Sequence, residues 1–250
     1  MPEMPAEHPN KAAFLARVRE ALGRTEPILH TPDHAPLKSN QARQEEKVRT
    51  VLARVAARRP ALCDRLADVA ARASWNVHRA ATPDRAAEVV ADIADGLKAR
   101  HVVRTAEDVF TRVDVDGALR REGISPAILA AGRARRRSEL KPMAFRADLG
   151  IVGVAYAIAE TASCAVIQRK GVARLASLAP PVLAVVVEAD QVLESLDDFF
   201  ALMRLEHQKG RSHWAPYFNF ISGPSRTADI EQTLTIGVHG PGKVHMVLVG

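Results

Sequence analysis

The residues best suited to hold a ligand lie toward the C-terminal end of the 250-residue sequence, in a segment that reads FISGPSRTADIE over residues 220–231. Gly223 and Pro224 predict a tight turn after a strand, and we expect a helix over residues 227–236. Backbone N–H groups at such a turn can hold an anion, and the guanidinium of Arg226 would be a second donor. The segment therefore predicts an anion or phosphate pocket.

Helix capping explains the same segment without a ligand. Ser225 or Thr227 could cap the expected helix. Asp229 and Glu231 would lie in or near its first turn, where carboxylates complement the helix dipole. Spacing alone slightly favours capping, so both roles stay open for these residues.

A glycine-rich stretch, GVHGPG, follows over residues 237–242. Gly240 and its neighbours could let a ligand approach the backbone closely, or could form a C-cap and a turn before a final strand. His239 is a candidate catalytic residue, since an imidazole titrates near neutral pH. A turn histidine with satisfied hydrogen bonds is the alternative.

A second constellation, GIVGVAYAIAETAS, runs over residues 150–163. Gly150 and Gly153 are a weak signal for a ligand-binding loop. Glu160 stands in an apolar neighbourhood, where a carboxylate should be paired, should cap a backbone group, or should be functional with a raised pKa. Glu160 is therefore the second candidate catalytic residue, and Thr161 adds a hydroxyl beside it.

The usual signatures of enzyme active sites are missing from the sequence. It contains no G-x-S-x-G elbow, no phosphate-binding loop, no H-E-x-x-H and no paired C-x-x-C. Cys63 and Cys164 are its only cysteines, too few for a disulfide framework or for the four ligands of a zinc or iron–sulfur site. We therefore expect no metal and no cofactor in this chain.

The elements that must position these residues alternate between helix and strand. Amphipathic patterns and capping signals predict helices at 41–58, 60–73, 82–98, 116–121 and 196–203, besides 227–236. Apolar runs predict strands at 75–79, 101–105, 124–130, 151–154, 164–168, 182–187, 217–221 and 244–249, with a hairpin-like turn at 168–171. Continuous apolar strands are typical of sheets buried on both faces. The sequence thus predicts an α/β fold with a mostly parallel sheet flanked by helices.

A helical N-terminal extension precedes this domain. The pattern after Asn10 predicts a short amphipathic helix with Gly23 as its C-cap, and a proline-containing linker follows. We therefore divide the chain into residues 1–40, the N-terminal helix and linker, and residues 41–250, the α/β domain.

The composition, 47% hydrophobic and 26% charged, is that of an ordinary globular protein. No stretch approaches the roughly 18 uninterrupted apolar residues that a membrane helix requires. The start of the sequence lacks the pattern of a secretory signal. We therefore expect a cytoplasmic protein with no membrane span.

The net charge of +6 is unevenly placed: residues 1–147 carry 27 basic and 19 acidic side chains, and residues 148–250 carry 8 and 10. The densest basic cluster, at 133–146, could steer anions or could lie on a solvated helix face. Aromatic residues make up 4% of the chain and leave few rings for base stacking. We expect no nucleic-acid partner, whereas an anionic small molecule stays open.

The sequence resembles the LUD domain family, of the lactate utilization protein C type, in three motifs: AIAET at 157–161, RLASLAPP at 174–181 and FISGPSRTADIEQTLTIGVHGP at 220–241. The resemblance implies a fold similar to sugar-phosphate isomerases and CoA transferases. It also implies a cytoplasmic role in oxidising L-lactate to pyruvate, beside partner subunits that carry iron–sulfur clusters. This chain would be an accessory subunit rather than redox-active itself. A small-molecule transferase or ligase that binds a phosphate-bearing or CoA-like substrate is the alternative.

Two positions depart from the pattern of the family. Its members commonly have an aspartate just before AIAET and a histidine soon after the double proline, where this chain has Ala155 and Leu183. If both positions touch a ligand, one pocket has lost an acid and an imidazole. That pocket then binds something different or keeps only an interaction role. The candidates that match the family are Glu160, Thr161, Ser225, Arg226, Thr227, Asp229 and His239.

Overall fold

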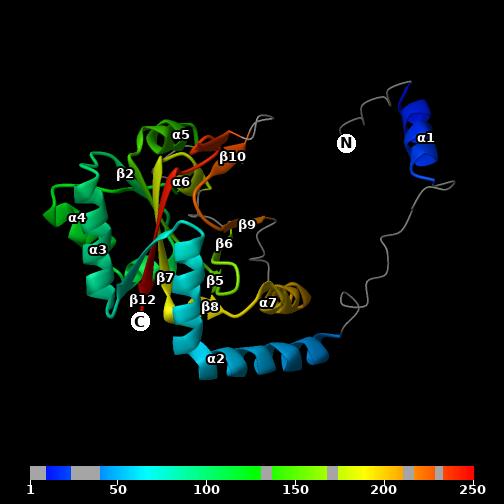
Figure 1. Cartoon of the computed structure of the whole chain (residues 1–250), viewed down its shortest axis with the longest axis horizontal. Helices are drawn as coiled ribbons and strands as arrows, with labels where there is room; N and C mark the ends of the chain where they lie inside the picture. The colour runs from blue at the N-terminus through cyan, green and yellow to red at the C-terminus, as the bar shows by residue number, and fades with distance from the viewer. Residues whose placement is uncertain (1–9, 24–39, 131–136, 168–173, 211–216, 229–232) are drawn as a thin grey trace. The chain divides into compact units, whose positions relative to one another are not determined.

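Figure 1 shows the chain as a computed structural model, which describes residues 10–23, 40–130, 137–167, 174–210, 217–228 and 233–250. The chain divides into two compact units, Met1–Asn40 and Gln41–Gly250. In the first unit, α1 (Lys11–Ala21) ends shortly before Gly23, whose φ of +63° suits a residue just past a helix. The side chains of Phe14 on this helix and of Leu22 directly after it are exposed.

The second unit is built on a sheet of six parallel strands in the order β1-β12-β7-β4-β2-β3. Their bounds are Asn76–Ala80 (β1), Val102–Arg104 (β2), Ala127–Ile128 (β3), Leu149–Gly153 (β4), Val182–Glu188 (β7) and Lys243–Val249 (β12). The apolar runs at 151–154, 182–187 and 244–249 produce the centre of this sheet. The predicted α/β fold with a parallel sheet is confirmed.

The two faces of this sheet carry different layers. On one face α3 (Pro83–Gly96) and α4 (Val115–Arg121) pack over a cluster that includes Ala184 and Val186 of β7. Their neighbours Leu183 and Val185 point to the other face, as the alternation of a strand requires. Thr82 accepts a hydrogen bond from the Arg85 N–H and so begins α3, which confirms the expected capping signal.

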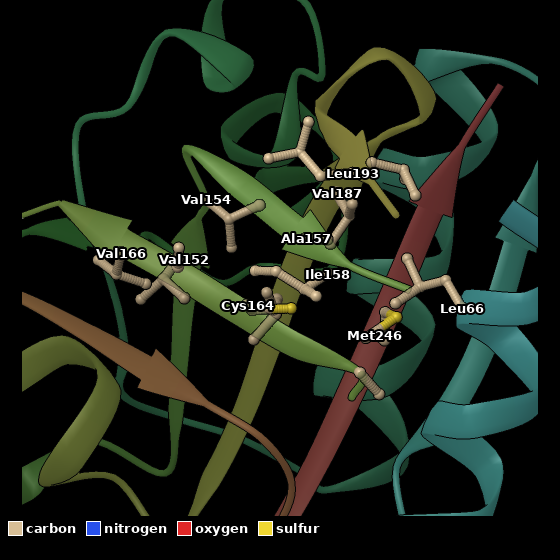
Figure 2. Packing of buried hydrophobic residues seen from close by; sticks show 14 of the residues in the cluster. Leu66, Val152, Val154, Ala157, Ile158, Cys164, Val166, Val187, Leu193 and Met246 are labelled. Carbon is tan, nitrogen blue, oxygen red and sulfur yellow. The ribbon is translucent and has the colours of Figure 1, made fainter. Parts of the chain in front are cut away.

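A second sheet of four strands, in the order β8-β5-β6-β9, belongs to the larger apolar core with α2 (Gln41–Arg72) and α7. The bounds are Tyr156–Ile158 (β5), Ser163–Ile167 (β6), Val192–Leu193 (β8), Phe218–Ile221 (β9), Leu175–Leu178 (α6) and Leu196–Gln208 (α7). In Figure 2, Ile158 and Cys164 of the second sheet meet Met246 of β12, with Leu66 of α2 beside them. This contact joins the two sheets into one core.

The two helices predicted at 41–58 and 60–73 are one helix, α2 (Gln41–Arg72), with Pro60 inside it. Pro60 removes one backbone hydrogen bond and crowds the preceding turn, which bends a helix without always ending it. Figure 1 shows that α2 changes direction sharply along its length. The buried Leu62, Leu66 and Ala70 keep the part beyond the bend against the core.

The helix predicted at 227–236 is wrong. In its place β10 (Arg226–Ala228) pairs antiparallel with β11 (Leu234–Ile236), and Arg226 lies opposite Ile236. Thr227 faces Thr235 in this hairpin, and a β-branched pair suits strands better than a helix. The Ser, Thr and Asp residues that suggested a helix cap serve equally well beside turns.

Smaller differences concern short elements. The strand expected at 124–130 is only the two residues of β3, while α5 (Arg137–Arg146), η2 (Asp108–Thr111) and η3 (Ala189–Gln191) were not expected. The turn predicted at 168–171 lies outside the described residues, as does part of the basic cluster. In the part of the chain that the structure describes, no helix is both long and apolar enough to cross a membrane.

Candidate functional site

Glu160 caps a helix. It follows β5, and its Oε1 accepts a hydrogen bond of 2.7 Å from the backbone N–H of Leu196, the first residue of α7. Ser195 supplies a second cap, since its Oγ accepts from the Asp198 N–H at 3.2 Å. A carboxylate beside a helix N-terminus is stabilised by the helix dipole. Of the three roles left open for Glu160, backbone capping is the one that the structure contains.

A chain of hydroxyl groups joins the two sequence constellations. Thr161 donates to Ser163 at 2.9 Å, and the Oγ atoms of Ser163 and Ser222 lie 2.6 Å apart. Two hydrogen bonds, through Ser163, therefore connect Thr161 to Ser222, which lies between β9 and the turn at Gly223. The segment after β5 and the segment after β9 are thus brought together, although Ser163 and Ser222 are 59 positions apart in the sequence.

The turn at Gly223 packs against the end of α2. Gly223 has φ of +135°, and a Cβ on it would lie 2.7 Å from the carbonyl oxygen of Ala73. Arg226 donates from Nη2 to the Oγ of Ser74, which directly follows Ala73. Arg226 therefore lies near the C-terminal end of a helix and not near the N-terminus on which the predicted anion pocket depended.

Ser225 organises the glycine-rich loop. Its N–H donates to the Pro241 carbonyl at 2.8 Å, and its own carbonyl accepts from the Gly237 N–H at 2.9 Å. Its Oγ accepts from the backbone N–H of His239 at 3.2 Å. A Cβ on Gly240 would stand 3.5 Å from the Ser225 Cβ. These contacts hold the loop in place, and the His239 side chain is exposed to solvent.

Trp75 is a residue that sequence analysis placed only at the start of a strand. It is 4% exposed, and its indole Nε1 has no hydrogen-bond acceptor among the described residues. A Cβ on Gly223 would lie 4.0 Å from this nitrogen. A buried N–H without an acceptor costs about 1–3 kcal/mol, and an acceptor atom of a ligand would remove that cost. We call Ser74, Trp75, Ser222, Gly223 and Arg226 the α2-end cluster.

Gly150 and Gly153 lie apart from this cluster, on β4 of the parallel sheet. A Cβ on Gly150 would lie 2.1 Å from the Ala176 carbonyl of α6. A Cβ on Gly153 would lie 2.7 Å from Val109 and 2.9 Å from Glu107. Each glycine therefore admits a covering element close to the sheet, which accounts for it without a ligand. Thr227 is half-buried in β10, and Asp229 lies outside the described residues.

Leu183 lies on β7 of the parallel sheet, whereas Ala155 lies in the segment between β4 and β5 that leads to the second sheet. Leu183 pairs in register with Gly150 and is fully buried in the apolar core. Ala155 lies beyond the end of β4 at Gly153, and its N–H donates to the Ala165 carbonyl of β6 at 2.9 Å. The hypothesis that one pocket lost both an acid and an imidazole stays a prediction.

The carboxyl ends of β2 and β4 form a second location that sequence analysis missed. The chain leaves β2 toward η2 and α4 on one face, and leaves β4 toward the second sheet on the other face. Ligands in open α/β sheets bind outside such a switch point. Thr105 and Glu107 follow β2 there, both are buried, and the Thr105 hydroxyl donates to the Glu107 carboxylate. The signal that could have found them is a polar T-x-E directly after an apolar strand.

An ion pair fixes this edge. Arg104 donates to Asp116 of α4 through Nε at 2.6 Å and Nη2 at 2.7 Å, and through Nη1 to the Thr105 carbonyl at 2.8 Å. Such bidentate geometry sets both position and orientation. The clamp holds α4 against the end of β2. Among the described residues, no group of three or more His, Cys, Asp or Glu side chains could hold a metal ion.

Comparison with known proteins gives the following. The profile of the LUD domain matches residues 63–249. Lactate utilization protein C from Halalkalibacterium halodurans is 25% identical over 189 residues, 74% of this chain and 80% of that protein. Lactate utilization protein C from Exiguobacterium sp. is 35% identical over 109 residues, 44% of this chain and 47% of that protein.

A solved structure has the same fold. It is the crystal structure of a DUF162 family protein from Deinococcus radiodurans, with a TM-score of 0.50 and 22% sequence identity. The match covers 77% of this chain and 98% of that chain. At this level of identity the likeness concerns the fold alone.

Proposed function

The chain belongs to the LUD domain family, and from this premise we propose that it acts in lactate utilization, as an accessory subunit of a cytoplasmic system that oxidises L-lactate to pyruvate. The observation that carries the proposal is the LUD match over residues 63–249, together with relatives named for lactate utilization. The match includes the hydroxyl chain, the α2-end cluster and the carboxyl edge of β2.

We place the electron transfer of this system in partner subunits that carry iron–sulfur clusters. Both cysteines of this chain are buried within the larger apolar core, Cys63 on α2 and Cys164 on β6. Burial raises the pKa of Cys164 to about 12 and also raises the pKa of Cys63. Iron is ligated by the thiolate form, which these surroundings disfavour. The cysteines therefore do not suit a cluster, which supports an accessory role.

Gene deletion tests the proposal. Cells that lack this gene should fail to grow on L-lactate as sole carbon source, while growth on pyruvate continues, and the intact gene should restore growth. Affinity purification of the tagged chain from lactate-grown cells should recover proteins with iron–sulfur clusters. Normal growth of the deletion strain on L-lactate, with no such protein recovered, contradicts the proposal.

A second candidate function is a transferase or ligase that acts on a phosphate-bearing or CoA-like substrate. The α2-end cluster favours it, because the indole N–H of Trp75 lacks an acceptor among the described residues and the exposed Arg226, which donates to the neighbouring Ser74, has further N–H donors. The helix N-terminus that first suggested an anion site here is absent. The support therefore comes from the two side chains and not from a backbone turn.

Titration calorimetry with CoA, nucleotides and sugar phosphates tests this second function. Trp75→Phe keeps an aromatic ring and removes the N–H, so it should weaken binding about ten-fold if the indole donates to the ligand. Arg226→Gln should weaken it further. Arg121→Gln, an exposed arginine on α4, is the control and should leave binding unchanged. No heat with any of these compounds argues against the function.

A further inference from the structure

A cavity of about 290 Å³ lies at the amino ends of β2 and β3. Its apolar lining consists of Val102, Val103, Ala127 and Met143. Thr105 and Glu107 follow the carboxyl end of β2, so the cavity lies at the opposite end of this strand. The cavity also shares no residue with the α2-end cluster. It is therefore a separate site within the α/β domain.

The rim of this cavity is basic. Arg100 and His101 come from the segment that leads into β2, and Arg146 is the last residue of α5. All three side chains are exposed, and Ser125, two residues before β3, also lines the cavity. Polar donors around an apolar base are typical of sites for small ligands.

The two arginines of the rim are not held by any carboxylate that the structure describes. Within the described residues, neither Arg100 nor Arg146 forms an ion pair, and the Arg146 Nε has only a long contact of 3.4 Å to the Pro142 carbonyl. By contrast, Arg54 and Arg112 are held by carboxylates. The guanidinium groups of the rim therefore have donors available for an anion.

One carboxylate borders the rim, and backbone groups already occupy it. The Asp148 Oδ2 accepts from the N–H groups of His101 at 2.9 Å and Arg100 at 2.8 Å. These bonds, that of His101 first, hold the pKa of Asp148 below its usual value, so it is ionised at neutral pH. Asp148 fixes the segment that carries both rim side chains and offsets one positive charge. Two guanidiniums against one carboxylate leave the rim net positive.

We propose that this cavity binds a small organic anion, whose carboxylate or phosphate group is held by Arg100 and Arg146 and whose apolar part lies on Ala127 and Met143. Guanidinium forks match both kinds of oxyanion in bidentate geometry. The volume is near the lower end of the range for ligand pockets, about 300 to 1,000 Å³, so the apolar part is a single ring or a short chain. The inference is independent of the proposed role in lactate utilization.

Titration calorimetry with five compounds tests the proposal. Phenyl phosphate and benzoate carry an anion on a ring, benzyl alcohol has the ring without the charge, and inorganic phosphate and L-lactate have the charge with little or no apolar surface. Phenyl phosphate or benzoate should bind at least ten-fold more tightly than each of the other three. The comparison between these two shows whether the site prefers a phosphate or a carboxylate.

Variants connect the binding to this cavity. Arg100→Gln with Arg146→Gln should lower the affinity at least ten-fold, and Ala127→Leu, which fills the apolar base, should lower it similarly. Arg121→Gln is the matched arginine control, and Trp75→Phe is the control for the other site. Neither control should change the affinity. Circular dichroism of each variant establishes that it is folded.

Several outcomes contradict the proposal. If benzyl alcohol binds as tightly as phenyl phosphate and benzoate, the cavity binds apolar groups and the anion plays no part. If inorganic phosphate binds as tightly as phenyl phosphate, the anion binds to the charged surface and the apolar cavity plays no part. Absence of binding by all five compounds, or full affinity in the folded double variant, rules the site out.

Discussion

The imidazoles of His78 and His245 are stacked on neighbouring parallel strands and share a hydrogen bond of 2.9 Å between Nε2 and Nδ1. His245 is 6% exposed, and its Nε2 has no partner among the described residues. Whichever ring carries the shared proton, this Nε2 stays unsatisfied. Full protonation of the pair would remove the acceptor and place positive charge in a buried site.

This pair predicts that the free energy of unfolding decreases in mild acid. Burial, His78 and Lys243 lower the pKa of His245 to about 4, and burial also lowers the pKa of His78, with Asp92 acting in the opposite direction. An unfolded histidine has a pKa of about 6.5. Between these values the unfolded chain binds protons that the folded chain does not, so stability is lost as the pH falls from about 6.5 to about 4. The His245 contribution is up to about 3 kcal/mol.

Urea denaturation across this pH range measures the effect. His245→Gln removes the titrating ring and should flatten the pH dependence between about pH 6.5 and about pH 4.5. His239→Gln, at an exposed position, is the control and should keep the slope of the parent. A slope in His245→Gln as steep as in the parent would show that other groups cause it.

Loss of the Glu160 cap should destabilise the domain. Glu160→Ala removes the acceptor of the Leu196 N–H and should lower the free energy of unfolding by about 1 kcal/mol, the usual value of a helix cap. Glu160→Gln keeps an acceptor without the charge and should lower it by less. Urea denaturation measures both, with Glu122→Ala at an exposed position as the control. Parent-like stability of Glu160→Ala means that the cap is dispensable.

Gly150 and Gly96 should respond oppositely to the same substitution. Gly150→Ala places a Cβ 2.1 Å from the Ala176 carbonyl, which forces α6 away from the sheet and should lower the free energy of unfolding by about 3 kcal/mol or more. Gly96→Ala, in α3 with nothing within 4 Å of the new Cβ, should raise it by about 0.5 to 1 kcal/mol. Thermal unfolding of both proteins checks the pair. Equal effects would mean that α6 does not pack as described.

The two cysteines should resist alkylation in the folded protein. Both are buried, and the pKa of Cys164 is raised to about 12, so neither forms an exposed thiolate near neutral pH. Iodoacetamide followed by mass spectrometry should detect no label on Cys63 or Cys164 in the native protein and both labels after denaturation. Rapid labelling of Cys164 in the native protein would contradict its position in the core. A role for Cys164 as a ligand of an iron–sulfur cluster would then be open again.

The parallel sheet was predictable because its strands carry their signal locally. The run from Val182 to Val187 is apolar throughout, which strands buried on both faces require. The 32-residue helix α2 was divided at Pro60 because proline usually ends a helix, and only the packing of Leu62 and Leu66 beyond the bend shows that it continues.

The candidate site was less predictable because it depends on contacts between distant segments. The motif at 220–231 indicated a turn, which the structure contains, but the elements after it depend on pairing between Thr227 and Thr235 that no local pattern encodes. Trp75 and Glu107 became candidates only when Gly223 and Gly153 were seen beside them. The expected ligand-binding roles stay predictions.

The position of β12 between β1 and β7 has a consequence for biosynthesis. Among the strands that the structure describes, β1 has β12 as its only neighbour in the parallel sheet, and Asn76 and Val244, which are joined across this pair, are 168 positions apart. At a translation rate of about 5 to 20 residues per second, a ribosome needs roughly ten to thirty seconds to synthesise that interval. During this time β1 has no strand to pair with, and the nascent chain exposes an edge that a chaperone can shield.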